Sequence, residues 1–84
     1  SLEQNYPNPF NPSTNIRFSI SNSGFVTLKI YDALGRSVAV LVNEKFTAGE
    51  YETTFDASHL PSGVYLYRIE TPFFTETKKM ILVK

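Results

Sequence analysis

One short stretch of the chain carries the side chain types of a hydrolase. Asp56, Ser58, His59 and Ser62 could in principle supply a carboxylate, a nucleophile and a base. A working triad needs these groups on different elements, with an oxyanion hole facing the nucleophile. Here they crowd into a single segment, so we interpret it as a corner in which Asp56 and Ser58 bond nearby backbone. We predict no catalytic residue and no enzyme activity.

The chain also has few residues that could bind a metal ion or a cofactor. His59 is the only histidine and the chain has no cysteine, whereas a zinc site uses three or four nitrogen or sulfur ligands. Calcium could use Asp32, Asp56 and loop carbonyls, but no EF-hand loop or other dense acidic spacing is present. No glycine-rich phosphate loop or dinucleotide fingerprint occurs. We therefore predict no metal site and no cofactor.

Composition bounds the possible partners. The chain has 84 residues, enough for one domain, and its 42% hydrophobic and 14% aromatic content is typical of a folded core. Eight basic and eight acidic residues cancel, which argues against nucleic acid and against an anionic membrane surface. The longest purely apolar run, 38–42, is far below the roughly 20 residues of a membrane span.

The sequence predicts that these residues are positioned by β-strands. Alternating apolar and polar residues, separated by turn residues, predict strands near 16–20, 26–31, 36–43, 51–55, 65–69 and 73–83. The 36–43 strand, rich in β-branched residues, is expected to be buried on much of both faces, with 43–49 as a loop. Residues 1–14 hold three of the five prolines, which predicts an extended lead-in and a possible seventh strand.

These elements predict an all-β fold, an antiparallel immunoglobulin-like or fibronectin type III-like β-sandwich of about seven strands over residues 15–84. Leu60-Pro61-Ser62-Gly63-Val64-Tyr65 is similar to the tyrosine corner of such sandwiches. In that motif the phenol hydroxyl donates to upstream backbone. Asp32-Ala33-Leu34-Gly35 favours a tight turn with a left-handed glycine.

Several short motifs, in order, resemble those of a known family. They are Tyr-Pro-Asn-Pro-Phe-Asn-Pro at 6–12, the alternating strand 16–20, Val-x-Leu-x-Ile-Tyr-Asp at 26–32 with Gly-Arg at 35–36, Ala-Gly at 48–49, Leu-x-x-Gly-x-Tyr at 60–65 and the Lys-Lys-apolar strand 78–84. Over residues 2–84 the chain resembles the type A C-terminal sorting domain of proteins exported by the type IX secretion system.

The resemblance implies a non-catalytic signal module. It implies an upstream cargo domain with its own export signal, passage through the periplasm, and recognition by the outer-membrane secretion machinery. Cleavage by a sortase-type protease and attachment at the cell surface, or release outside, would follow. The recognition residues that it implies are Pro7, Asn8, Pro9, Phe10, Gly63, Tyr65, Lys79 and Lys84.

Two other interpretations stay open. The immunoglobulin-like domain of the flagellar hook-capping protein opens similarly, but it usually carries Trp-Asp-Gly where this chain has Phe55-Asp56-Ala57. A carbohydrate-binding or spacer module of a polysaccharide-degrading enzyme is the alternative from another functional class, because Phe25, Tyr31, Phe46 and Phe73 fall on outward or loop positions. For the sorting role, we expect Lys79 on the last strand to face outward, beside an edge that a partner strand could extend.

Overall fold

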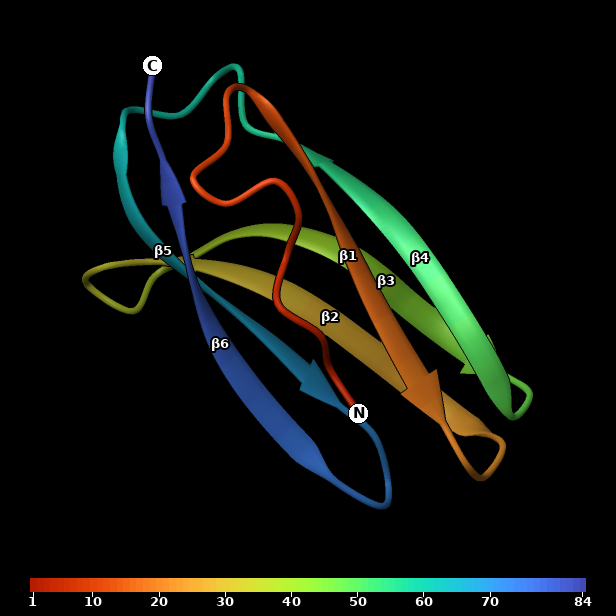
Figure 1. Ribbon diagram of the computed structural model, residues 1–84. Coiled ribbons are helices and arrows are strands. Elements are labelled where there is room, and N and C mark those ends of the chain that lie inside the picture. Colours follow the sequence, from red (N-terminus) through yellow and green to blue (C-terminus); the bar gives the residue numbers. More distant parts are fainter.

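A computed structural model describes residues 1–84 and contains six β-strands and no helix. The strands are β1 (Ser13–Ile20), β2 (Gly24–Asp32), β3 (Ser37–Phe46), β4 (Gly49–Asp56), β5 (Gly63–Glu70) and β6 (Thr75–Leu82). β1 and β4 form a two-stranded sheet, and the other four form a sheet in the order β3-β2-β5-β6. Every strand pair is antiparallel, and Figure 1 shows the smaller sheet lying across the larger one.

The alternation of apolar and polar residues along the strands determines which side chains form the core. Every second residue of β1, β2 and β5 is buried between the sheets. The C-terminal ends of β4 and β6 add further buried side chains. The resulting single cluster includes Ile16, Phe18, Val26, Leu28, Ile30, Phe55, Tyr65, Tyr67, Ile69, Met80 and Leu82. One apolar face on each sheet is thereby removed from water, which is the main favourable term in folding.

The lead-in does not form a seventh strand. It touches the sheets through three isolated bridges, Leu2 to Phe18, Tyr6 to Asn15 and Phe10 to Leu82. Proline cannot donate to a ladder, so the three prolines of this segment interrupt its pairing and limit it to single residues. Leu2 and Phe10 are nevertheless buried in the common core. The lead-in is therefore packed against both sheets.

The expectation for residues 36–43 is wrong in one respect. They form a strand, but no residue of β3 is fully buried, and β3 lies at an edge of the larger sheet. Because the smaller sheet has only two strands, it covers the inner face of β3 only in part, and Leu41, Val42 and Phe46 stay half-buried. The loop expected at 43–49 is also shorter, since β3 continues to Phe46 and β4 begins at Gly49.

The turns match the sequence more closely. Gly35 has a φ of 86° and its N–H donates to the Asp32 carbonyl at 3.0 Å, as the turn chemistry predicts. The Asp32 carboxylate also accepts from the Leu34 and Arg36 N–H groups. The structure contains no helix long and apolar enough to span a membrane.

Candidate recognition surface

The two ends of the chain are hydrogen-bonded to each other. The Phe10 N–H donates to the Ile81 carbonyl, and the Val83 N–H donates to the Phe10 carbonyl, both at 3.0 Å. The Asn8 side chain oxygen accepts from the Ile81 N–H at 3.0 Å, across 73 positions of sequence. The lead-in thus occupies the outer edge of β6 at its C-terminal half. We call the surface formed by residues 7–10 and 81–84 the joined ends.

A buried polar pair shapes the lead-in on its inner side. The Pro7 carbonyl accepts from the Thr14 hydroxyl at 2.8 Å and from the Asn5 amide at 3.1 Å. Asn5 and Thr14 are only 2% and 1% exposed, and the Asn5 amide also donates to the Thr14 oxygen. Pro7, Asn8 and Pro9 are exposed, so this motif presents its outer side to solvent while its base is fixed.

The corner at 57–62 lies beside the joined ends. Ser62 accepts from the Lys84 N–H at 3.0 Å, and the Lys84 ammonium donates to the Ser58 carbonyl at 2.6 Å. The Ser58 N–H donates to the Asp56 carboxylate, which holds the pKa of Asp56 below its ordinary value of 3.8. The Asp56 carboxylate therefore bonds local backbone, as the sequence interpretation of this corner proposes, and Ser58 takes part through its own N–H group.

The tyrosine corner predicted at 60–65 is confirmed. The Tyr65 hydroxyl donates to the Pro61 carbonyl at 2.6 Å, and the ring is 4% exposed. Gly63 begins β5 with a φ of 154°, a value that side-chain-bearing residues rarely adopt. Gly63 pairs with Leu82 and Tyr65 with Met80, so the corner holds the same strand that the lead-in covers from the other side.

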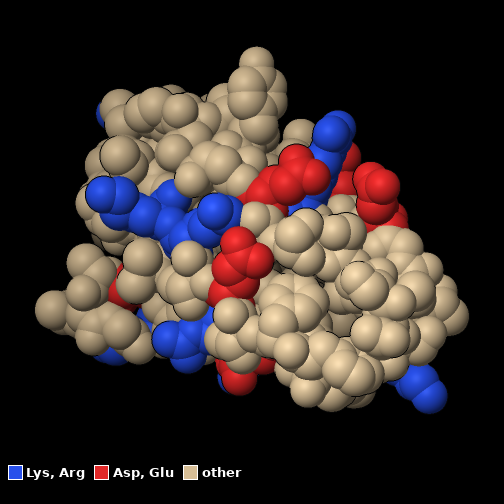
Figure 2. Space-filling model, turned by 60° about the horizontal axis from the view of Figure 1, so that its bottom comes forward, with Lys and Arg blue, Asp and Glu red and all other residues tan.

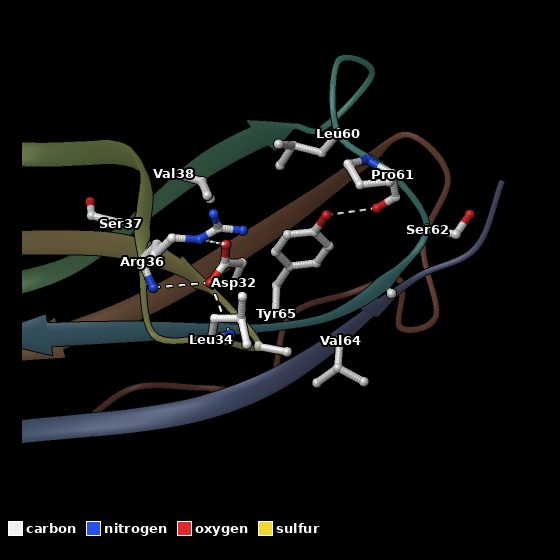
Figure 3. Close-up of a pocket in the computed structure, with 12 residues that line it drawn as sticks. Asp32, Leu34, Arg36, Ser37, Val38, Leu60, Pro61, Ser62, Val64 and Tyr65 are labelled. Carbon is white, nitrogen blue, oxygen red and sulfur yellow. Dashed lines mark hydrogen bonds and ion pairs between the residues drawn. The ribbon is translucent and has the colours of Figure 1, made fainter.

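A groove of about 530 Å³ opens between this corner and the β2–β3 turn. Figure 3 shows Leu34, Val38, Leu60 and Val64 around it, with the Tyr65 ring directed toward Pro61. Arg36 donates to Asp32 at 2.7 Å on one rim. The carboxylate of Asp32 has a lowered pKa, chiefly because it accepts from the Arg36 backbone N–H.

Lys79 lies apart from the joined ends, farther back along β6. It is exposed and pairs with Leu66 of β5, and its carbonyl accepts from the Gln4 amide at 2.8 Å. Of the eight sequence-predicted positions, four bond or pair with the last residues of β6 and one lies just beyond that strand. They are Asn8, Phe10, Gly63, Tyr65 and Lys84. Pro7 and Pro9 flank Asn8, and Lys79 stands farther back on β6. No group of three or more His, Cys, Asp or Glu side chains is placed to hold a metal ion.

Sequence reasoning missed the roles of two tyrosine hydroxyls. Tyr67 donates to the Glu3 carbonyl at 2.7 Å and accepts from the Asn5 N–H at 2.8 Å, and burial raises its pKa to about 12. Tyr51 donates to the Thr47 carbonyl at 2.6 Å, which is a second corner of the Tyr65 kind. The Gly-x-Tyr spacing shared by 49–51 and 63–65 could have revealed it.

The zero net charge hides a separation between the two sheet faces. Strand alternation places four cations and one acid on the outer face of the larger sheet: Lys29, Lys45, Arg68, Lys79 and Glu70. The outer face of the smaller sheet carries the opposite excess: Glu50, Glu52, Asp56 and Arg17. Figure 2 shows a group of basic side chains at the left of the view and acidic side chains mainly at the centre and right, where single basic side chains also occur.

The structure is that of a small all-β module with two packed antiparallel sheets, whose two chain ends are hydrogen-bonded to each other. The sequence model of the secretion system C-terminal sorting domain matches residues 4–84, and the chain belongs to that family. Its role is accordingly that of a sorting signal for type IX secretion, carried by an exported parent protein. A comparison with curated proteins finds no match.

Proposed function

We propose that the joined ends are the surface that the outer-membrane secretion machinery reads during export. The observation that carries this proposal is the pairing of the Phe10 backbone with Ile81 and Val83. This pairing brings residues from near the two ends of the chain into one continuous surface. Asn8, Val83 and Lys84 are exposed within it and are therefore accessible to a receptor.

We further propose the steps that would complete this role. The module passes through the periplasm with its cargo, is cut off by a sortase-type protease, and leaves the cargo at the cell surface or outside. The module itself is non-catalytic. The two packed sheets and the Tyr65 hydrogen bond to Pro61 support an immunoglobulin-like or fibronectin type III-like description of its fold.

The hydrogen bonds limit how a receptor could add a strand to β6. Alternation directs the backbone groups of Thr75, Thr77, Lys79 and Ile81 away from β5. Those of Ile81 are already bonded to Asn8 and Phe10, and the Lys79 carbonyl is bonded to Gln4. A partner strand therefore has free access only near Thr75 to Lys79, or must displace the lead-in.

The test is export of a reporter. Residues 1–84 are fused behind a fluorescent protein that carries an inner-membrane export signal, and are expressed in a bacterium with a type IX system. We expect the reporter at the cell surface or in the medium. Reporter retained in the periplasm would contradict the sorting role.

Substitutions then locate the recognised surface. Asn8→Ala and Lys84→Glu alter the joined ends, whereas Lys45→Glu changes an exposed strand lysine on β3 and is the matched control. We expect export to fall for the first two variants only. Truncation after Lys79 is a poorer test, since it removes Met80 and Leu82, which are 0% and 1% exposed in the core. Equal export of all three variants would contradict the assignment of this surface.

A further inference from the structure

The strand edges of this fold are not equally open. The lead-in bonds the outer edge of β1 through Glu3, Tyr6 and Ser1 and closes part of β6. β3 pairs with β2 through two register shifts, an irregularity that blunts an edge against strand addition. β4 pairs with β1 over eight residues without a shift, and neither a strand nor the lead-in bonds its other side.

The backbone groups on the open side of β4 can be identified from β1. The N–H and carbonyl of Asn15 bond to Tyr6, so Asn15 faces away from β4. Backbone groups alternate in direction along a strand, so Arg17 and Ser19 also face away from β4. In an antiparallel pair, the β4 residues directly opposite these β1 residues face away from β1 as well. They are Thr54, Glu52 and Glu50. The N–H and carbonyl groups of these three residues have no hydrogen-bond partner in the protein, and Figure 1 shows β4 at the rim of the molecule.

A groove of mixed polarity, about 260 Å³ in volume, adjoins this edge. It lies between β3 and β4. Its apolar part is formed by half-buried Leu41, Val42, Phe46 and Tyr51 with buried Phe18, and its polar part by Asn43, Glu44, Glu52 and Thr53. The groove exists because a two-stranded sheet faces a four-stranded one and covers the inner side of β3 only in part. A third strand beside β4 would extend the smaller sheet over these side chains.

Charge defines what that strand would carry. Glu50, Glu52 and Asp56 are exposed on the outer face of β4, and the one cation opposite them is Arg17, 3.5 Å from Glu52. Opposite charges on directly paired strand residues are favourable, and like charges are unfavourable. Pairing of β4 with β4 of a second copy would align acidic residues with one another, so self-association through this edge is disfavoured.

We propose that the β4 edge is a strand-addition site for an extended polypeptide segment in which basic and apolar residues alternate. Its backbone bonds Glu50, Glu52 and Thr54, its apolar side chains cover Leu41 and Val42, and its basic side chains face the β4 carboxylates. This site lies on a different side of the sandwich from the joined ends and does not depend on the export role.

The probe is a capped seven-residue peptide of alternating lysine and valine, added to the isotopically labelled 84-residue chain. We expect saturable NMR shifts at Glu50, Glu52 and Thr54, and slower exchange of those three amide protons. A peptide of alternating glutamate and valine should bind at least about tenfold more weakly, a difference of about 1.4 kcal/mol. No shift at these amides, equal affinity for both peptides, or dimerisation through β4 would each overturn the proposal.

A matched pair of variants separates backbone pairing from charge attraction. Thr54→Pro removes an N–H that faces away from β1, a position where an edge strand tolerates proline. Thr54→Val keeps this N–H and, like proline, lacks the hydroxyl bond to Asn15. We expect Thr54→Pro to weaken the lysine–valine peptide at least about tenfold and Thr54→Val to change it less than about twofold. If the two variants bound the peptide equally, the peptide would be held by charge attraction alone, and the proposal of strand addition would be overturned.

Discussion

Tyr65 and Tyr51 make the same hydrogen bond in two different settings. Each hydroxyl donates to the carbonyl four residues upstream, at 2.6 Å, and each tyrosine stands two residues after a glycine with a φ of 154°. Tyr65 is buried, whereas Tyr51 is half-buried beside Phe18 and Phe46. Loss of a buried hydrogen bond leaves a polar group unsatisfied, so the same bond should matter more at Tyr65.

The first prediction follows from that difference. Tyr65→Phe should lower the free energy of unfolding by about 1 kcal/mol or more, because the Pro61 carbonyl loses its donor. Tyr51→Phe serves as the control and should cost less, since water can reach Thr47. Urea unfolding measures both, with the midpoint shifting for Tyr65→Phe. An unchanged midpoint for that variant would contradict the role of the corner.

The second prediction concerns Tyr67 and the stability of the fold at alkaline pH. Its pKa is about 12 in the folded protein, raised by burial, against 10.0 for an exposed phenol. Between these values the folded state holds a proton that the unfolded state has lost. Stability is therefore fully present below pH 10 and falls as pH rises toward 12, by about 3 kcal/mol from this group.

Tyr67→Phe tests the assignment. The variant should be less stable at neutral pH, because the Glu3 carbonyl and Asn5 N–H lose their partner. Its unfolding free energy should also decline less between pH 10 and 12 than that of the unaltered protein. Urea titrations at a series of pH values give both quantities. Parallel declines in the two proteins would assign the alkaline loss to other groups.

At the scale of elements, the lead-in links the two sheets. Phe10 is 2% exposed, and its ring centroid lies 6.3 Å from that of Phe55 of β4, while its backbone bonds β6. One residue of an irregular segment thus contacts the edge strands of both sheets. The joined ends consequently depend on the core as well as on their own hydrogen bonds.

Phe10→Ala should therefore destabilise the fold strongly. Truncation of a buried phenylalanine costs about 3–5 kcal/mol, a large part of the stability of a small domain. Tyr6→Ala, at a side chain that is 79% exposed in the same segment, is the control and should cost less than about 0.5 kcal/mol. Thermal unfolding measured by circular dichroism distinguishes them. Similar melting temperatures would show that the lead-in contributes little to the core.

The same scale shows what sequence reasoning could reach. Alternation predicted the inward faces of β1, β2 and β5, because local pattern and burial agree there. It failed for β3, whose apolar composition does not reveal that the opposing sheet lacks a strand to cover it. The Tyr65 corner was predictable from its local spacing, whereas Asn8 and Ile81 are 73 positions apart and no local signal links them.

At the scale of the whole molecule, the joined ends affect whether the lead-in unfolds together with the two sheets. Chain termini ordinarily fray and open locally with little free energy. Here Tyr6 exchanges backbone hydrogen bonds with Asn15, and Phe10 with Ile81 and Val83. If these contacts belong to the same folding unit as the core, then opening the lead-in requires unfolding of the sheets.

Amide hydrogen exchange tests this directly. We expect the N–H groups of Tyr6, Phe10 and Val83 to exchange only through global unfolding, with free energies within about 1 kcal/mol of the amides at the centre of β2 and β5. The Phe10→Ala variant should lower the protection of all these amides together, because the core and the lead-in lose the same contact. Fast exchange at Tyr6 and Phe10, with unchanged protection in β2, would mean that the lead-in opens alone. A receptor could then reach the β6 edge without unfolding the domain, and strand addition at Ile81 would regain the access that the lead-in otherwise blocks.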